Sequence, residues 1–318
     1  MSGKGPLLEV TGLKKYFRTK HGILHAVDDV SFSIEKGRTL GVVGESGCGK
    51  STTGRAILRL LEPTDGRVLF EGEDIAALDE EQLRRKRTEM QIIFQDPFSS
   101  LNPRMTISQT IEEPIELHGI IPNRAKREQK VLELMETVGL APRLRNAYPH
   151  ELDGGRRQRI GIARALAVDP KFIVCDEPVS ALDVSIQAQI LNLLKDLQER
   201  LGLTYMFITH DLSVVYHFSD DIAVMYLGKL IEKASSDELF ARPLHPYTQA
   251  LLSAIPVPSL HNRKKRILMK GEISSPVDPP AICRFANRCP QAMERCRESE
   301  PELREISPGH FVSCFLCE

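Results

Sequence analysis

The chain has 318 residues and a formal net charge of −1, with 42% of its residues hydrophobic and 27% charged. A chain of this length buries one large core or two modest ones. Its balanced charge argues against a general positive field for nucleic acid or an acidic membrane surface. No apolar run approaches the roughly 20 residues of a spanning helix, and the N-terminus lacks the apolar core of a secretory signal. We therefore expect a cytoplasmic chain that serves a membrane process only by docking onto other subunits.

The first third of the chain predicts strands that lead into a helix. Residues 7–13, 25–34 and 38–44 have the alternating or continuous apolar character of β segments. The elements expected next are a helix over residues 51–61, a strand and turn over 66–75, and a buried strand over 90–96.

A glycine-rich loop separates the third strand from the first helix. Gly44–Ser51 fits the pattern G-x-x-x-x-G-K-[ST] in the context that this motif requires. Glycines let backbone N–H groups curl around phosphates, and the helix N-terminus adds a favourable dipole. Lys50 is expected to reach the β- and γ-phosphates, and the Ser51 hydroxyl to bind Mg²⁺. The residues predicted to contact ATP here are Gly44, Glu45, Ser46, Gly47, Cys48, Gly49, Lys50, Ser51 and Thr52.

A second strand ends in two acidic residues. In KFIVCDE, Asp176 at the strand tip suits the Mg²⁺ shell, and Glu177 suits the polarisation of an attacking water. An apolar-Asp-Glu run alone is common and often structural, so its distance downstream of the glycine loop carries the inference. The other elements expected in this part are helices over 106–140, 155–167 and 185–202 and a strand over 203–211.

Strands that alternate with helices imply a mainly parallel sheet covered on both faces, with functional side chains at the carboxyl ends of the strands. The composition changes near Arg242–Pro258, where prolines interrupt the chain, and the basic run HNRKKR follows. We place a domain boundary between about residues 240 and 260, since prolines and charge runs mark linkers.

Further segments make the chain resemble the nucleotide-binding subunits of ABC transporters over about residues 7–240. Gln95 in IIFQDP is similar to the Q-loop glutamine of that family, which senses Mg²⁺ and water and links to the membrane subunits. Ser180–Asp183 matches the D-loop, and His210 in FITHDL matches the histidine that contacts the γ-phosphate. The aromatic side chain that stacks on adenine corresponds to Phe17, with Tyr16 as the alternative.

This resemblance implies an α/β fold of the ABC-type P-loop ATPases. Such a fold has a mixed core sheet, an antiparallel β subdomain, a helical signature subdomain and, here, a small Cys-rich C-terminal extension. The expected ranges are 1–250 for the ATPase domain, about 96–168 for its helical subdomain, and 251–318 for the extension.

The family signature, LSGGQ, is altered in this chain to LDGGR within Leu152–Arg159. In the family, the serine donates toward the γ-phosphate of ATP bound to the opposing subunit. Asp153 replaces this donor with an ionised acceptor, which repels phosphate unless it is protonated or turned away, and Arg156 offsets part of that charge. We therefore expect an asymmetric dimer whose site capped by Asp153 hydrolyses ATP poorly; the alternative is a harmless outward-pointing side chain. The residues expected to act across the dimer are Asp153, Gly154, Gly155 and Asp183.

Segments outside these motifs indicate a particular ABC system. DPFSSLNPRMTISQTIEEP and RPLHPYTQALLSAIP resemble the ATPase subunits of bacterial dipeptide, oligopeptide and nickel importers, in their second-ATPase branch, and the tail resembles their extension. The resemblance implies a peripheral subunit on the cytoplasmic face of the cell membrane. Its partners are two membrane-spanning permease subunits, a second ABC ATPase in a heterodimer and, indirectly, a solute-binding protein. ATP hydrolysis then powers uptake of di- or oligopeptides, with nickel or another small solute as the alternative cargo.

Two other classes of function were weighed. A soluble ABC ATPase acting on DNA would carry a long coiled coil between glycine loop and signature, and one acting on ribosomes would carry two cassettes; neither is present, so no nucleic-acid partner is expected. A hydrolytically dead subunit is suggested by Asp153 but opposed by Glu177 and His210.

Five of the seven cysteines crowd into the last part of the chain. Clustered thiols in a reducing compartment are more often metal ligands than disulfides. Structural zinc prefers C-x₂₋₄-C pairs, a spacing present here only between Cys314 and Cys317. Four irregularly spaced cysteines can hold a [4Fe–4S] cluster, which members of the peptide-importer group carry in this extension; zinc and an unmetallated tail are the alternatives. The predicted ligands are Cys283, Cys289, Cys296 and Cys314, with Cys317 as a substitute or a free thiol. The arginines at 284, 288, 295 and 297 are expected to offset the cluster's charge, and the alternative for them is an ordinary solvated basic face.

Overall fold

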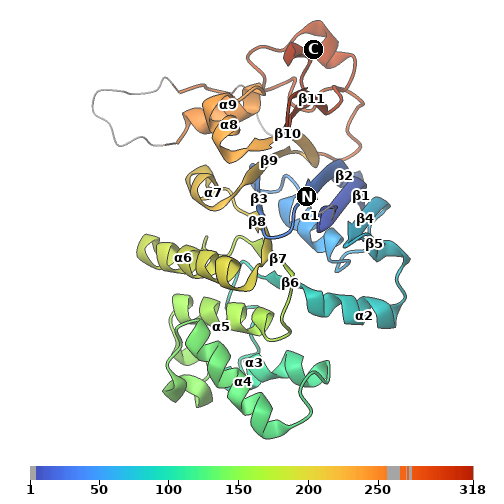
Figure 1. Cartoon of the computed structure of the whole chain (residues 1–318). Helices are drawn as coiled ribbons and strands as arrows, with labels where there is room; N and C mark the ends of the chain where they lie inside the picture. The colour runs from blue at the N-terminus through green and yellow to red at the C-terminus, as the bar shows by residue number, and fades with distance from the viewer. Residues whose placement is uncertain (1–4, 256–265, 270, 272–273, 318) are drawn as a thin grey trace, which may run out of the picture. The chain divides into compact units, whose positions relative to one another are not determined.

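A computed structural model describes residues 5–255, 266–269, 271 and 274–317 (Figure 1). The chain forms two compact units. The first unit comprises Met1–Glu35, Thr39–Ala76 and Phe207–Glu318, and the second comprises Lys36–Arg38 and Ala77–Met206.

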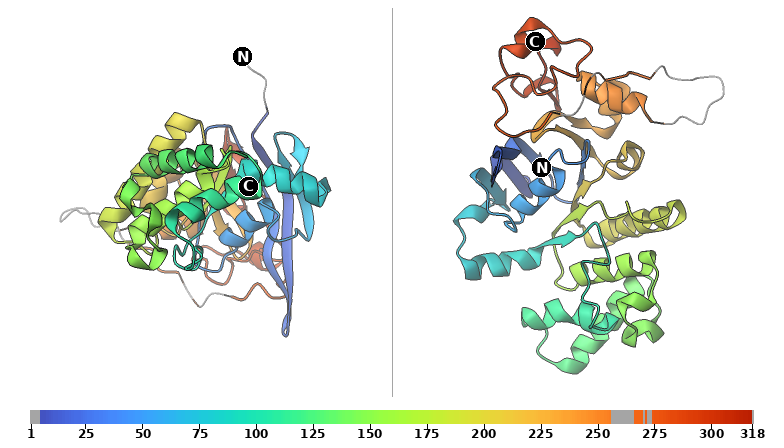
Figure 2. Two further views of the ribbon diagram at one scale, coloured as in Figure 1. Left: turned by 90° about the horizontal axis from the view of Figure 1, so that it is seen from below. Right: turned by 180° about the vertical axis from the view of Figure 1, so that it is seen from behind.

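An antiparallel sheet in the first unit is built on a long hairpin, drawn in blue in Figure 2. Pairing between its two strands runs from Leu8↔Ile34 to Thr19↔Gly22. The sequence predicted strands at both places but made the first too short, because its buried positions end at Leu13 while the exposed ladder continues. The strands, in the order β2-β1-β4-β5, are β1 Leu8–Thr19, β2 Gly22–Ile34, β4 Asp65–Phe70 and β5 Glu73–Asp74.

The first unit also contains the neighbouring strands β11-β12-β10-β9-β3 of a mixed sheet. The strand β3 pairs with β9 in parallel, whereas β10 pairs antiparallel with both β9 and β12. The bounds are β3 Thr39–Val43, β9 Asp221–Tyr226, β10 Lys229–Ser235, β11 Arg304–Ser307 and β12 His310–Val312. The helices of this unit are α1 Lys50–Ile57, α7 Leu212–Phe218, α8 Ser236–Ala241 and α9 Pro246–Ser253, with 3₁₀ turns η4 Glu294–Arg297 and η5 Phe315–Cys317. The Cys-bearing tail therefore adds strands to this sheet.

The second unit is mostly helical, and its helices α3, α4 and α5 pack on one another (Figure 1). Two strands, β6 Met90–Ile93 and β7 Phe172–Asp176, pair in parallel, and the chain leaves the unit within β8 Thr204–Ile208. The helices are α2 Glu80–Glu89, α3 Ile107–Leu117, α4 Arg124–Thr137, α5 Gly154–Leu166 and α6 Val184–Leu201, with 3₁₀ turns η2 Pro142–Asn146 and η3 Pro149–Glu151; a further turn, η1 Ile75–Ala77, joins the units. Among the helices formed by the described residues, none is long and apolar enough to cross a membrane.

Local signals explain which helices the sequence predicted. Gly202 adopts a left-handed conformation, φ 66°, just after α6, as expected for a glycine that ends a helix. The helix α2 was missed because it has a single buried residue, Leu83, and so lacks an apolar stripe. Its start is nonetheless marked by a capping box in which Asp79 and Gln82 satisfy each other's backbone N–H groups.

A buried acid joins the tail to the rest of the first unit. Glu232 on β10 is fully buried and accepts from the backbone N–H groups of Leu244 and His245, at 2.7 and 3.0 Å. The Nε2 atom of His310 on β12 lies 2.9 Å from a Glu232 oxygen, and this side chain is only 1% exposed. The hydrogen bond to Glu232 raises the pKa of His310, so the protonated imidazolium stabilises the fold.

Replacement of His310 by Gln is expected to lower the free energy of unfolding by about 1–3 kcal/mol at pH 6. Because the folded pKa of His310 lies above the unfolded value of about 6.5, its contribution is complete below that pH and is lost as the pH rises through the folded pKa. Urea denaturation of both proteins from pH 6 upward measures this difference. His21→Gln at an exposed turn is the control, and a difference that stays constant or grows with pH contradicts the assignment.

Candidate functional site

The glycine-rich loop joins β3 to α1, and two of its glycines permit close backbone approach. Gly44 and Gly49 have φ angles of 151° and 105°, values that side-chain-bearing residues rarely adopt. A Cβ atom at Gly44 would lie 2.2 Å from the Met225 carbonyl oxygen, and one at Gly49 would lie 2.1 Å from that of Ala26. Glycine is therefore required at both places by the neighbouring backbone as well as by the curl of the loop.

Lys50 begins α1 and turns back over the loop. Its Nζ atom donates to the carbonyl oxygens of Gly44 and Glu45, at 2.8 and 3.0 Å, and the residue is 4% exposed. Cys48 is also buried, and burial raises the pKa of its thiol, so it is held as a neutral packing residue. Ser51 and Thr52 are half-buried in the first turn of the helix, whereas Ser46 and Gly47 are exposed at the loop tip.

Two further predicted residues lie in the first unit. His210 is exposed directly after β8 and Thr209, and the following residue, Asp211, caps α7 by accepting from Ser213 N at 2.8 Å. A short capped helix thus fixes the chain direction just beyond His210.

The two aromatic residues on β1, Tyr16 and Phe17, make different contacts. The Tyr16 hydroxyl lies 2.5 Å from an Asp28 oxygen, and its ring stacks on His25 with 4.0 Å between centroids. Phe17 is half-buried, with the Lys15 ammonium 4.9 Å from its ring centroid. Tyr16 is therefore engaged by Asp28 and His25, whereas the Phe17 ring contacts Lys15.

The acidic residues lie in the second unit at the end of β7. Asp176 is 1% exposed, and Glu177 follows with φ 47°, an unusual value for a residue with a side chain. The Gln95 amide donates to a Glu177 carboxylate oxygen at 2.9 Å, so the Q-loop glutamine and the second acid are brought together. Strained backbone of this kind clusters at functional sites.

The D-loop is closed by local hydrogen bonds. The Ser180 hydroxyl donates to the Glu177 carbonyl at 3.1 Å, and Asp183 caps α6 by accepting from Ile186 N at 3.1 Å. The Gln187 amide donates to the carbonyls of Val179 and Leu182, both at 3.0 Å. The loop after Glu177 is therefore tied to the start of α6.

The altered signature begins α5. Asp153 is its N-cap and accepts from Arg156 N at 2.8 Å, while its other carboxylate oxygen lies 3.5 Å from an Arg156 guanidinium nitrogen. A Cβ atom at Gly154 would lie 3.1 Å from Leu182, and one at Gly155 would lie 2.6 Å from Cγ2 of Ile186. The paired glycines thus let the signature approach the D-loop and α6.

Sequence reasoning missed the side chain that joins the signature helix to the segment after Gln95. Arg157 is 5% exposed, donates to the Pro149 carbonyl at 2.6 Å, and stacks on Phe98 with its guanidinium carbon 3.4 Å from the ring centroid. Cation–π stacking of this kind prefers arginine. The one sequence feature that could have indicated this contact was the aromatic residue Phe98 shortly after the Q-loop glutamine, and its side chain is exposed.

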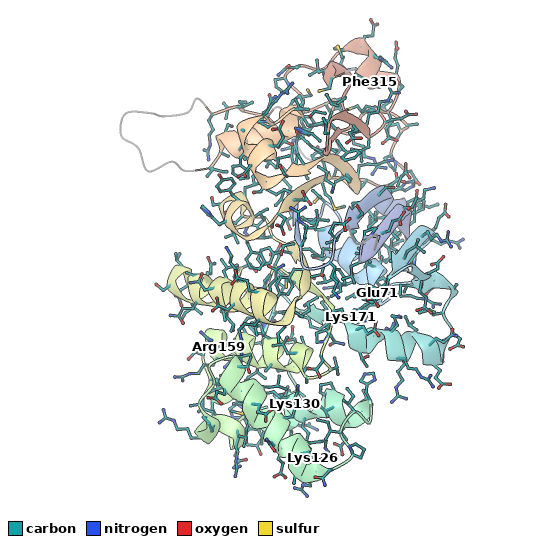
Figure 3. The ribbon with its side chains drawn as sticks, in the orientation of Figure 1. Glu71, Lys126, Lys130, Arg159, Lys171 and Phe315 are labelled. Carbon is teal, nitrogen blue, oxygen red and sulfur yellow. The ribbon has the colours of Figure 1, made fainter. Side chains whose placement is uncertain are left out.

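The cysteines of the tail gather around a small apolar cluster. Cys296, Ala286 and Phe315 are buried together, and Cys283 packs on them; Phe315 is labelled in Figure 3. Burial raises the pKa of Cys283 to about 11 and that of Cys314 to about 12, and nearby thiols add to both shifts. Within the described part of the chain, no group of three or more His, Cys, Asp or Glu residues is arranged to hold a metal ion.

Two tail arginines have partners other than the thiols. Arg284 pairs with Asp28 and also donates to the Leu227 carbonyl. Arg288 makes a two-pronged ion pair with Glu45 of the glycine-rich loop, at 2.7 and 3.0 Å. These two arginines are therefore engaged by acids of the nucleotide-binding part, and their predicted role beside a cluster stays a prediction.

The comparisons with known proteins agree with this arrangement. A model of the ABC transporter family matches residues 27–180, and one of the oligopeptide/dipeptide transporter C-terminal region matches residues 231–296. The dimeric ATP-binding cassette MJ0796, in a post-hydrolysis state with ADP and Pi, has 31% identity and a TM-score of 0.65, covering 72% of this chain and 98% of its own. The cassette cbiO1 of Clostridium perfringens has 27% identity and a TM-score of 0.66, covering 74% and 91%. The fold and these relatives define an ABC-type ATPase, which confirms the predicted α/β fold of the ABC-type P-loop ATPases.

Full-length relatives narrow the class. The oligopeptide transport ATP-binding protein AppF of Bacillus subtilis is 54% identical, covering 98% of this chain and 97% of its own length. A putative peptide import ATP-binding protein of Brucella abortus is also 54% identical, covering 97% of each. The chain belongs to the oligopeptide and peptide import ATP-binding proteins of ABC transporters.

The close approach at Gly155 gives a stability test. Gly155→Ala is expected to destabilise the chain by about 1–3 kcal/mol, because the new methyl group overlaps the stiff β-branched Ile186. Gly161→Ala, on the same helix with nothing within 4 Å of the added Cβ, is the matched control. This control is expected to be neutral or to stabilise by up to about 1 kcal/mol. Equal unfolding free energies for the two variants in urea would show that the packing is not tight.

Proposed function

We propose that this chain is the ATP-hydrolysing motor subunit of an importer for di- or oligopeptides. It works on the cytoplasmic face of the cell membrane with two permease subunits and a second ATPase subunit, and a solute-binding protein delivers the cargo. The observation that carries this proposal is the near-full-length likeness to oligopeptide transport proteins, which includes the C-terminal region after the ATPase core. That region supports an importer over a soluble ATPase acting on nucleic acid, and the relatives' names support peptide over nickel. In this proposal, residues 1–250 form the ATPase domain and residues 251–318 form the C-terminal extension.

The residues divide the work of hydrolysis. Lys50 and the loop N–H groups bind the phosphates of ATP. Ser51, Gln95 and Asp176 would hold Mg²⁺, which would neutralise charge on the phosphates. Glu177 takes a proton from the attacking water. The Gln95 amide donates to one Glu177 oxygen, which orients the carboxylate.

The other predicted residues complete the nucleotide site. His210 contacts the γ-phosphate as a donor, and Phe17 stacks on the adenine ring. Gly154, Gly155 and Asp183 serve the site of the opposing subunit.

The general-base role has a direct test. Glu177→Gln keeps the volume and the ability to pair with Gln95 but removes the proton acceptor, so ATP turnover is expected to fall about 10²–10⁴-fold. Equilibrium binding of Mg·ATP is expected to stay close to that of the original chain. Glu199→Gln, an exposed acid on α6, is the control. Turnover within twofold of the original protein would contradict the role.

The signature supports an asymmetric pair of ATP sites. Asp and Ser cap helices about equally well, so Asp153 preserves the start of α5. A capping serine still has a hydroxyl hydrogen to donate to phosphate, whereas the ionised carboxylate has none and adds negative charge. The Arg156 guanidinium is near, but both side chains are more than half exposed, so solvent screens the offset.

Asp153→Ser in the assembled heterodimeric complex is expected to raise ATP turnover by roughly twofold, since a second site would then donate to the phosphate as the first does. Asp79→Ser, which exchanges the same residues at the N-cap of α2, is the matched control. Unchanged turnover in the Asp153 variant would count against two unequal sites.

We propose that the tail cysteines hold an iron–sulfur cluster, and this proposal rests on the chemistry of their surroundings, since the described residues contain no group of three or more potential ligands already arranged around a metal ion. Cys283, Cys289 and Cys296 interact electrostatically with one another, and Cys314 interacts with Cys317, Cys283 and Cys289. Backbone N–H groups of Phe285, Gln291 and Leu316 hydrogen-bond to the thiols of Cys283, Cys289 and Cys314 and lower their pKa values against the effect of burial. Cysteines spread around a small core with N–H donors would suit a [4Fe–4S] cluster, because the cluster would bind them as thiolates and such hydrogen bonds would stabilise its charge. A bound cluster would cross-link the four places in the tail where these cysteines lie.

Anaerobic purification of the full chain is expected to give a brown protein whose broad visible absorption bleaches with dithionite. Cys314→Ser is expected to lose this absorption, and Cys317→Ser to keep it. A colourless protein with one zinc ion per chain would overturn the assignment.

A further inference from the structure

We propose that the C-terminal region positions the phosphate-binding loop: Arg288 and Tyr247 hold Glu45, and through it Lys50, in the arrangement that binds ATP. This inference rests on the proposed binding of ATP by Gly44–Ser51. Both holding residues lie within residues 231–296, which the model of the oligopeptide/dipeptide transporter C-terminal region matches, and neither is part of the predicted nucleotide contacts.

The first contact is the ion pair between Arg288 and Glu45. Both carboxylate oxygens are engaged, at 2.7 Å from Nη1 and 3.0 Å from Nη2. The Arg288 side chain is 9% exposed and that of Glu45 21%, so water and salt screen the pair less than a surface pair. The hydrogen bonds to Glu45 raise the pKa of Arg288. A two-pronged pair fixes orientation as well as distance.

The second contact acts on the main chain of the same residue. The Glu45 N–H donates to the Tyr247 hydroxyl at 3.0 Å, and Tyr247 on α9 is fully buried. The Glu45 carbonyl accepts from Lys50 Nζ at 3.0 Å. Side chain, N–H and carbonyl of Glu45 are therefore all engaged, and the third of these contacts reaches the lysine expected to bind phosphate.

The holding residues are themselves rigidly packed. Tyr226, Tyr247 and Phe285 form an aromatic cluster with ring centroids 4.8–5.4 Å apart, which is the range of favourable aromatic pairs. The Arg288 guanidinium carbon lies 5.8 Å from the Tyr226 ring, and Nη1 lies 3.4 Å from the Tyr226 hydroxyl. Tyr226 is next to Met225, whose carbonyl confines Gly44. The strand β9 and the tail thus hold the first turn of the loop together.

The tail makes a second ion pair within the first unit. Arg284 pairs with Asp28, whose carboxylate also accepts from Tyr16. Arg284 and Arg288 both lie between Cys283 and Cys289, so the segment that joins two of the clustered cysteines is also the segment that holds the loop.

Equilibrium titration of the full-length chain with Mg·ATP tests the proposal, together with the KM and kcat for ATP. Arg288→Met is expected to weaken ATP binding roughly tenfold, with the effect on Kd and KM rather than on kcat. Arg288→Lys is expected to recover part of the lost affinity, since lysine restores the charge but not the two parallel hydrogen bonds of the guanidinium group.

Glu45→Gln is expected to weaken ATP binding as well. The double variant Arg288→Met/Glu45→Gln is expected to bind ATP no more weakly than the weaker of the two single variants, because the two residues act as a pair. Arg304→Met, on the same region beside Glu302, is the control with unchanged affinity.

The outcomes separate this proposal from its rivals. A melting temperature lowered by Arg288→Met with unchanged ATP affinity would show an ion pair that only stabilises the fold and would overturn the proposal. If Arg288→Met does not fold, the isosteric Glu45→Gln decides by the same criterion. Absence of ATP binding by the original chain would refute the proposed function itself, whereas normal binding by every variant would refute only the positioning role.

Discussion

The phosphate-binding loop depends on how closely two carbonyl groups approach its glycines. The oxygens of Met225 and Ala26 occupy the space where side chains at Gly44 and Gly49 would begin. These carbonyls belong to β9 and β2 of the first unit, so the loop takes its form from strands distant in sequence. Close packing of backbone leaves little freedom to adjust, because protein interiors are as dense as crystals. Lys50 then folds over the carbonyl oxygens of the loop.

The C-terminal tail also stabilises the first unit. Its strand β12 pairs with β10, and His310 meets the buried Glu232. A buried acid without partners would be costly, so the tail completes the interior of the first unit. With Arg288 on Glu45, the region after the ATPase core supports both the sheet and the loop at its edge.

The sequence predicted those features whose signal is local. The glycine loop, the acids at the end of β7 and the glycine that ends α6 follow from a short pattern and the elements on either side. The pairing of Arg288 with Glu45 and the stacking of Arg157 on Phe98 join residues far apart in the chain, and composition or spacing does not carry such pairings. The sequence also did not predict the full length of the β1–β2 hairpin. The two strands pair as far as its exposed end, but the residues there do not alternate between apolar and polar.

The central claim is that this chain binds ATP through Gly44–Ser51, and calorimetric titration of the full-length protein with Mg·ATP tests it most directly. The account predicts saturable binding that Lys50→Met weakens by roughly tenfold or more, the value of a lost charge-assisted hydrogen bond. Lys195→Met on α6, exposed and outside the loop, is expected to leave the affinity unchanged. Equal affinities for the original protein and the Lys50 variant, or no binding at all, would contradict the account.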